Sequence, residues 1–90
     1  MKKVDYNIEG IGITVEVEEH DAKNQEHRLQ AYMIKSIREY SGMERKEFCD
    51  WLGIPYRTLQ DWELGNRVMH DYVLRLIAYK VRMEKTAGRI

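Results

Sequence analysis

The sequence predicts a mainly α-helical fold with an N-terminal β-hairpin, because apolar residues follow two different spacings along the chain. Residues 4–17 alternate between apolar and polar positions, which is typical of strands. From about residue 25 onward the apolar residues recur three and four positions apart, which is typical of helices. The length of 90 residues allows one small domain with a modest core and leaves no room for a second.

The composition is that of a folded chain, with 43% hydrophobic and 33% charged residues. No run of about 18 apolar residues occurs, so we expect no membrane span. The N-terminus has no charged-then-apolar signal segment, and the single cysteine, Cys49, cannot form an internal disulfide. Both features predict a cytoplasmic protein.

The alternating segment predicts two strands joined by a turn at Glu9-Gly10. Folding the chain there places all of its apolar residues on one face. A lone hairpin is marginally stable in water, so we expect this face to pack on the helical body or to pair with a second copy. The predicted cross-strand pairs are Ile8 with Ile11, Tyr6 with Ile13 and Val4 with Val15.

The first helix is expected at about residues 25–40, with Asp21 or Asn24 as its N-cap. Two short helices, at about 44–52 and 55–64, would then meet at Gly53. Glycine suits a sharp corner because it adopts positive φ without steric penalty. Pro55 fits the first position of the following helix, where its missing N–H would be unpaired anyway. The inner stripe predicted for the first helix comprises Leu29, Met33, Ile37 and Tyr40.

The two short helices have the spacing of a helix-turn-helix. Each carries an apolar pair three or four residues apart, and the small Cys49 lies where the helices would cross. This joint spacing makes DNA reading the leading functional hypothesis. The inward-facing residues would be Phe48, Leu52, Ile54, Leu59 and Trp62, with Trp51 also expected to pack against the core.

The last helix, from about residue 71 to 83 or 85, carries more apolar residues than a small core needs. Val73, Ile77 and Val81 form one stripe. We predict that a second stripe is a partner surface, most simply in a homodimer; the alternative is that the hairpin covers it. The chain would then divide into a hairpin and acidic connector (1–24), a helix-turn-helix domain (25–85) and a flexible tail (86–90). The second stripe comprises Tyr72, Leu76, Tyr79 and Met83.

Several motifs in order resemble the Xre/Cro-like family, the phage-repressor type of helix-turn-helix domain. Residues 37–43 resemble the end of the family's first helix and the loop after it, and residues 46–49 and 52–54 resemble its second helix and turn. Residues 62–67 resemble the family's W-E-x-G-x-R signature. The similarity covers residues 30–85, about two thirds of the chain. The resemblance implies a five-helix, lambda-repressor-like fold whose third helix, residues 55–64, enters the major groove; the hairpin is not part of the minimal family domain.

The resemblance also implies a set of DNA-contacting residues. Arg57 can bind guanine, Gln60 adenine and Asp61 cytosine, and Tyr56 can contact a thymine methyl group. Asp61 could instead orient Arg57 one helical turn away, and we expect Asp61 and Glu63 to repel phosphate. The residues expected to contact phosphates, which fix register without reading sequence, are Arg45, Lys46, Thr58, Asn66 and Arg67.

The charge of the chain is zero overall but unevenly distributed. Residues 1–27 hold three lysines against seven acids, and residues 28–90 hold twelve basic residues against eight acids. A basic face on the second part could attract phosphate, which agrees with a dimeric repressor of phage or mobile-element type. The acidic front, the zero total and the wide last helix favour an alternative. This is a protein-binding module such as an antitoxin or a small phage-encoded inhibitor of a host nuclease or defence enzyme, which could also regulate its own genes.

No pattern of residues predicts catalysis, a metal or a cofactor. His20, His27 and His70 lack the spacing of a zinc site, and no phosphate loop or nucleophile elbow is present. Cys49 is expected to be a core thiol, because no histidine neighbours it in the sequence. We therefore expect that the protein is not an enzyme.

Overall fold

The computed structural model describes residues 2–17 and 22–90, with side chains for residues 3–15 and 28–90. The fold is mainly helical with an N-terminal antiparallel hairpin, as predicted. The described residues contain four helices, so the five-helix expectation is not met there. In chain order the elements are β1 (Lys2–Ile8), β2 (Ile11–Val17), α1 (Ala22–Ser41), α2 (Arg45–Leu52), α3 (Tyr56–Leu64) and α4 (Asp71–Thr86).

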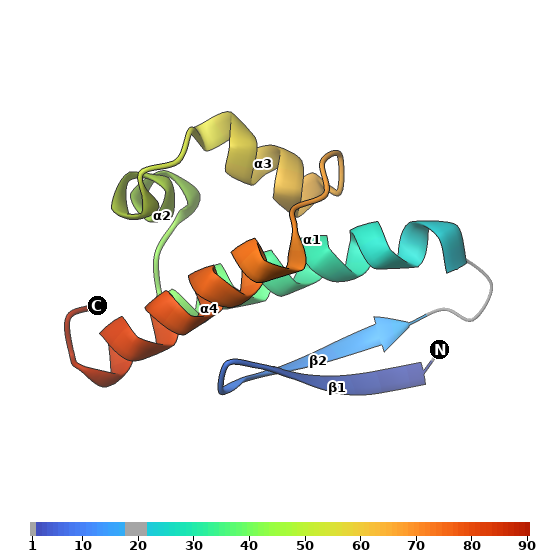
Figure 1. The fold of residues 1–90 in the computed structure, drawn as a ribbon, viewed down its shortest axis with the longest axis horizontal. Coiled ribbons are helices and arrows are strands. Elements are labelled where there is room, and N and C mark those ends of the chain that lie inside the picture. The colour runs from blue at the N-terminus through green and yellow to red at the C-terminus, as the bar shows by residue number, and fades with distance from the viewer. Residues whose placement is uncertain (1, 18–21) are drawn as a thin grey trace.

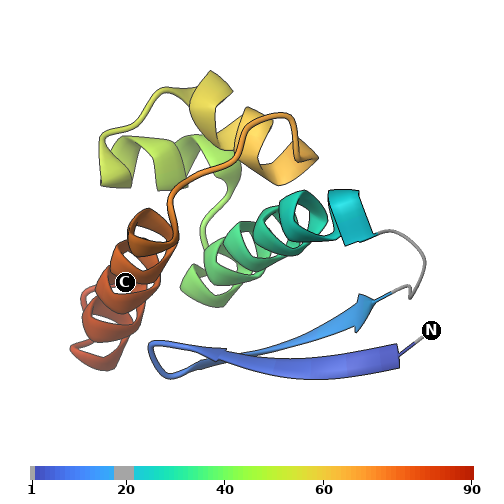
Figure 2. The ribbon, with the colours of Figure 1, turned by 45° about the vertical axis from the view of Figure 1, so that its right-hand side comes forward.

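The elements are arranged in three layers (Figures 1 and 2). Helices α1 and α4 form the middle layer, α2 and α3 lie on one side of it, and the hairpin lies on the other. Helix α1 is the central element, since it contacts α3, α4 and β2. All six elements contribute buried side chains to one continuous core, so the hairpin is part of the folded body.

The hairpin has the register that the alternation predicts. Ile8 pairs with Ile11, Tyr6 with Ile13 and Val4 with Val15. Glu9 and Gly10 both have positive φ, of 49° and 90°, as a tight two-residue hairpin turn requires. The apolar face packs on α1 and α4, which confirms the helical body as its cover. The buried residues of this face are Ile8, Ile11, Ile13 and Val15.

Helix α1 begins earlier and is buried more widely than the sequence predicts. It starts at Ala22, so Asn24 lies inside the helix and is not its cap, while Asp21 lies outside the described residues. Tyr40 is exposed, whereas Ile34 is fully buried without having been predicted. The reason is that α1 is covered on two sides, by the hairpin and by α3 and α4. Of the predicted stripe, Met33 and Ile37 are buried and Leu29 is partly buried.

A buried glutamine on α1 holds the loop that connects α3 to α4. Gln30 donates from Nε2 to the carbonyl of Met69 at 2.9 Å and accepts from the N–H of Met69 at 3.2 Å. The Gln30 side chain therefore satisfies both backbone hydrogen-bonding groups of Met69, which lies in a loop and not in a sheet or helix. This contact sets where α4 begins relative to α1.

The corner between α2 and α3 has the predicted glycine, and its proline occupies a different position from the expected one. Gly53 has a φ of 74°, and its N–H and that of Ile54 both bond to the Cys49 carbonyl. Pro55 is extended, with ψ at 142°, so it is the N-cap of α3 and not its first helical residue. Its carbonyl accepts the N–H groups of Thr58 and Leu59, which begins the helix.

The C-terminal residues contact the body in the structure, although the sequence predicts a flexible tail from Thr86. Thr86 is the last residue of α4, and Gly88 turns the chain with a φ of 76°. Arg89 forms an ion pair with Glu84, and Ile90 packs against the core. Lys85 also donates a hydrogen bond to the Tyr40 carbonyl, which joins the ends of α4 and α1.

We predict that Gln30→Ala lowers the free energy of unfolding by about 2–3 kcal/mol, because it leaves the buried N–H and carbonyl of Met69 without partners. Urea unfolding would measure the effect as a lower midpoint with an unchanged slope. Gln60→Ala is the matched control, since Gln60 is exposed on α3 and its loss should change stability by less than about 0.5 kcal/mol. Equal effects of the two substitutions would show that the two hydrogen bonds between Gln30 and Met69, which we call the Gln30 clamp, do not hold this loop.

Candidate nucleic-acid interface

Helix α3 presents most of the predicted base-reading residues to solvent. Tyr56, Arg57 and Gln60 are exposed, and Asp61 is partly buried at the edge of the same face. The opposite face holds Leu59, which is fully buried. The helical period accounts for Arg57 and Gln60, which point away from the side of position 59, whereas Tyr56 is exposed as the first residue of α3.

The carboxylate of Glu63 is buried between two arginines from other helices. Its side chain is 2% exposed. Arg38 of α1 binds it with two parallel hydrogen bonds, Nε to Oε2 at 3.0 Å and Nη2 to Oε1 at 3.2 Å. Arg45 of α2 adds a third, Nε to Oε1 at 3.3 Å. We call these three residues the Glu63 cluster; it joins α1, α2 and α3 at one point.

The burial of Glu63 corrects the expectation that it repels phosphate. Its negative charge is balanced by the two guanidinium groups, and the side chain does not reach the outer face of α3. A charge this deeply buried is tolerated only when it is paired and hydrogen-bonded. Glu63 is therefore a positioning residue for α3.

The loop between α1 and α2 is held by the same cluster. Arg38 donates from Nη1 to the Met43 carbonyl at 3.1 Å. The Ser41 hydroxyl donates to the Arg38 carbonyl and accepts the N–H of Met43 at 3.2 Å. These bonds satisfy the end of α1 and set the direction in which the chain enters α2.

Arg45, which the resemblance places at the DNA backbone, also has an internal role. Its pKa is raised by hydrogen bonding to Glu63 foremost and then to Tyr56. Arg45 therefore binds the buried carboxylate and lies near the exposed Tyr56 at the start of α3. A guanidinium carries five N–H donors, and the side chain is 43% exposed, so donors remain for a ligand.

The other predicted phosphate-contacting residues lie on α2, on α3 and in the loop after α3. Lys46, Asn66 and Arg67 are exposed, and Thr58 is partly buried. Within the described part of the chain, Asp61 makes no ion pair with Arg57, so the proposed orienting contact is absent there. The backbone carbonyl of Asp61 instead accepts the N–H of Asn66 at 2.9 Å, which closes the end of α3.

The basic excess of the second part of the chain lies mainly outside α2 and α3. Residues 44–67 hold four basic and five acidic residues, whereas residues 71–90 hold five basic and two acidic ones. The sequence-based argument for a basic face thus applies to α4 more than to the helix-turn-helix. On the helix-turn-helix, the exposed cations are Lys46, Arg57 and Arg67, together with the partly exposed Arg45.

Helix α2 is anchored by aromatic contacts and a buried thiol. The ring of Trp51 is 6.1 Å from that of the buried Phe48, and Lys80 of α4 lies over it at 5.0 Å. Trp51 therefore packs against the core, as predicted.

Burial raises the pKa of the Cys49 thiol, which disfavours the reactive thiolate. In the described ranges no His, Cys, Asp and Glu side chains gather in a group of three or more that could hold a metal; His20 and the His27 side chain lie outside those ranges.

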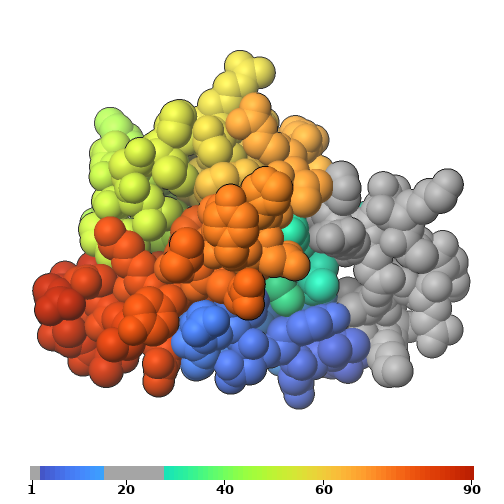
Figure 3. All heavy atoms as spheres, in the orientation of Figure 1, coloured from blue at the N-terminus to red at the C-terminus, as the bar shows by residue number. Residues whose placement is uncertain are grey.

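The second apolar stripe of α4 is exposed. Tyr72, Leu76, Tyr79 and Met83 are each between 41% and 64% exposed. The hairpin packs on a different side of α4, so it does not cover the stripe as the alternative proposed. Figure 3 shows α4 across the front of the molecule, between the helix-turn-helix and the hairpin turn. We call the four residues the α4 stripe.

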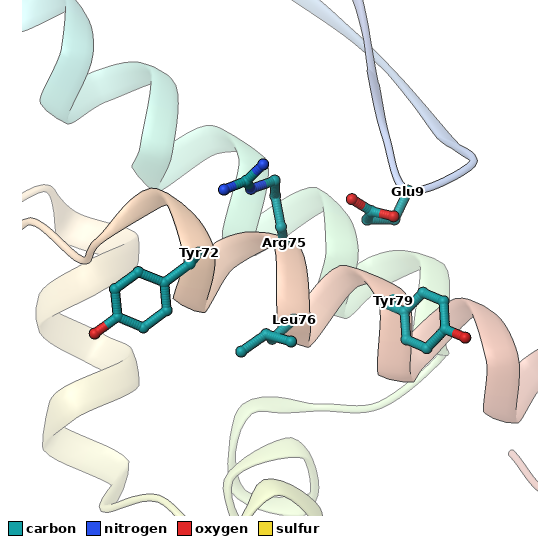
Figure 4. Close-up of a pocket in the computed structure, with 5 residues that line it drawn as sticks. All are labelled: Glu9, Tyr72, Arg75, Leu76 and Tyr79. Carbon is teal, nitrogen blue, oxygen red and sulfur yellow. The ribbon is translucent and has the colours of Figure 1, made fainter.

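A shallow pocket of 320 Å³ lies where the α4 stripe meets the hairpin turn (Figure 4). Its charged groups are the Glu9 carboxylate from the turn and the Arg75 guanidinium from α4. Neither group makes an ion pair with any part of the chain that the structure describes. The pocket is lined by Glu9, Tyr72, Arg75, Leu76 and Tyr79.

Comparison with models of protein families, with curated proteins and with solved structures finds no match to this chain. None of the described helices has both the length and the apolar character needed to cross a membrane.

We predict that Glu63→Gln lowers the free energy of unfolding by about 3 kcal/mol, because it leaves the guanidinium of Arg38 buried without a counter-charge. Chemical unfolding of the two proteins would measure the difference. Glu47→Gln serves as the control, since it removes an exposed acid from α2 and should cost less than about 0.5 kcal/mol. A Glu63→Gln variant as stable as the control would show that the cluster contributes nothing.

We also predict that Cys49 reacts with a disulfide reagent at least about 100-fold more slowly in the folded protein than in urea, because the thiol is buried and its raised pKa leaves little thiolate at neutral pH. The absorbance of the released thiolate follows the reaction. Rapid labelling without denaturant would contradict the burial of the Cys49 thiol on α2.

Proposed function

We propose that the protein is a sequence-specific DNA-binding regulator that reads the major groove with α3. The observation that carries this proposal is the contrast between the two faces of that helix. One face is held by the buried Glu63 cluster and Leu59, while the other exposes Tyr56, Arg57 and Gln60. A helix held rigidly from behind and polar in front is suited to reading base edges.

The exposed side chains of α3 have the donors and acceptors that base reading needs. Arg57 can form two hydrogen bonds with O6 and N7 of guanine, and Gln60 can do the same with N6 and N7 of adenine. Tyr56, at the exposed start of α3 near Arg45, can contact a thymine methyl group or a phosphate. Lys46 and Arg67 would contact the flanking phosphates and set the register.

The resemblance to the Xre/Cro-like family supports the same function. In this chain the signature at residues 62–67 contributes the buried Glu63 and the exposed Asn66 and Arg67. The proposal includes a phage or mobile-element type of repressor acting in the cytoplasm, which agrees with the single unpaired cysteine.

The charge distribution indicates how such a protein would bind. Because the helix-turn-helix has few exposed cations, each protomer would neutralise about four phosphates at most, and non-specific affinity would be modest. Specificity would depend mostly on base contacts. The dependence of affinity on salt should accordingly be shallow for a DNA-binding protein.

The acidic excess of residues 44–67 and the exposed α4 stripe favour a second candidate, a protein-binding module on the same scaffold. An antitoxin or a small inhibitor of a host nuclease would use such a surface. Co-purification with the product of a neighbouring toxin or defence gene, combined with the absence of any selected DNA sequence, would favour it over DNA reading.

The proposal predicts that Arg57→Ala relaxes specificity at one base position and costs about 1–3 kcal/mol on the best duplex selected from a random library. Arg67→Ala, the matched control, should weaken binding to all sequences about equally and lower the salt slope by about one. Fluorescence anisotropy at two salt concentrations measures both effects. The assignment fails if Arg57→Ala keeps the full sequence preference.

A further inference from the structure

We propose that the outer edge of β1 binds an extended, acidic segment of another protein, which adds to the hairpin as a third, antiparallel strand. The inference starts from a two-stranded sheet, in which each strand has one edge that the other strand does not pair. An edge strand presents a row of backbone N–H and C=O groups that a further chain can bond. The hairpin lies on the opposite side of α1 and α4 from α3, so this surface is separate from the proposed DNA-reading face (Figure 2).

The register of the hairpin determines which residues of β1 direct their backbone groups outward. The residues that flank a two-residue turn exchange both hydrogen bonds, and every second pair along the strands then does the same. Lys3, Asp5 and Asn7 lie between those pairs, so their N–H and C=O groups point away from β2. No hydrogen bond from the described part of the chain reaches these backbone groups. The bonded pairs are Ile8 with Ile11, Tyr6 with Ile13 and Val4 with Val15.

The apolar face of the hairpin is covered less well on β1 than on β2. Ile11, Ile13 and Val15 of β2, which lies against α1, are 2%, 5% and 6% exposed. Val4 and Tyr6, their neighbours on β1, are only partly buried. A third strand beside β1 would place apolar residues of its own against these two side chains. The unpaired backbone groups and the incompletely covered apolar surface therefore coincide on β1.

Strand β2 shows which side chains are compatible with a strand beside β1. It places β-branched residues opposite the apolar residues of β1, and Glu16 opposite Lys3. The hydroxyl of Thr14 donates to Oδ1 of Asp5 at 2.8 Å. A segment on the outer edge would lie beside the same side chains, because neighbouring strands share the two faces of a sheet. We therefore expect it to alternate β-branched residues with polar ones, including an acid opposite Lys3.

The turn end of β1 has more cations than acids. The pocket between the turn and α4 is lined by Arg75 and Glu9 (Figure 4). Arg82 lies over the same turn, because a Cβ on Gly10 would be 2.2 Å from its Nε. Two guanidinium groups of α4 therefore border the turn, which carries one carboxylate. An acidic residue of a bound segment would balance the second one.

The charge of the edge also favours a different protein over a second copy of this chain. The charged side chains that the structure describes on β1, in the turn and next to it are three cations and two acids: Lys3, Arg75 and Arg82 against Asp5 and Glu9. A second copy would bring the same excess of cations to the edge. An acidic segment would neutralise that excess, and it is the occupant that fits the edge best.

Fluorescence anisotropy tests the proposal with a labelled peptide that has the sequence of residues 11–19. This peptide has the required alternation and carries three acids. It should bind the unchanged protein saturably. A control peptide of the same composition, in which the order is scrambled so that the alternation is lost, should not bind.

Proline substitutions on the two edges identify the site. Asp5→Pro and Thr14→Pro each remove one outward N–H and the same side-chain bond, but they lie on opposite strands. Proline is tolerated in an edge strand where the N–H faces solvent, and circular dichroism would confirm that both variants fold. Asp5→Pro should raise the dissociation constant of the peptide about tenfold or more, and Thr14→Pro should leave it within about twofold.

Charge reversal tests the chemistry of the segment. Lys3→Glu should raise the dissociation constant of the same peptide about threefold or more, because an acid then faces an acid across the two strands. Lys35→Glu is the control, since it makes the same change at an exposed position of α1. It should leave peptide binding within about twofold of the unchanged protein.

Hydrogen exchange of the backbone amides tests the edge without any substitution. In the free protein the amides of Lys3, Asp5 and Asn7 should exchange rapidly, since their N–H groups point outward. Saturating peptide should slow the exchange of these three amides. The outward amides of Gly12 and Thr14 on β2 should remain as rapid as before.

The absence of saturable binding, binding that neither proline changes, or protection of β2 in place of β1 would each overturn the inference. Self-association that Asp5→Pro abolishes would do so as well, because the edge would then belong to a second copy. These outcomes are separable from the proposed function. The peptide should leave the affinity for a selected duplex unchanged, and a protein that binds the peptide but selects no DNA would contradict DNA reading alone.

Discussion

The position of α3 depends on the buried carboxylate of Glu63 and the two arginines that neutralise it. An unpaired carboxylate in this place would be strongly destabilising, so α3 can occupy its position only where Arg38 and Arg45 both reach it. The two parallel bonds from Arg38 constrain direction as well as distance. Rotation of α3 about its axis is thereby restricted, and this determines which of its residues face outward.

The remaining layers support that arrangement and provide a second surface. Helix α1 joins the other helices, because its Arg38 binds Glu63 of α3 and its Gln30 binds Met69 in the loop before α4. The hairpin buries its apolar face on α1 and α4 and leaves its turn beside the α4 stripe. The molecule thus has two outward surfaces on different helices, a polar one on α3 and an apolar one on α4, which can be altered independently.

Local patterns in the sequence were enough to predict the hairpin register and the corner at Gly53, because both follow from a period of two and from backbone freedom at one residue. The Glu63 cluster and the Gln30 clamp were not predictable in this way. Their partners lie 18 to 39 residues apart, and an acid or amide in a helix is expected at the surface until its partner is known. The resemblance predicted that Tyr56, Arg57 and Gln60 face outward, which the structure bears out, but it did not predict the absence of a basic excess around them.

The most direct measurement is a titration of the isotope-labelled protein with a selected duplex, followed by NMR of the backbone amides. If α3 reads DNA, the chemical shift changes should be concentrated in α3 and in the loop at residues 65–67, with the amides of the hairpin strands unchanged. Shifts that avoid α3 and gather on the basic α4 instead would contradict it, because DNA would then be attracted by charge and not read by this helix.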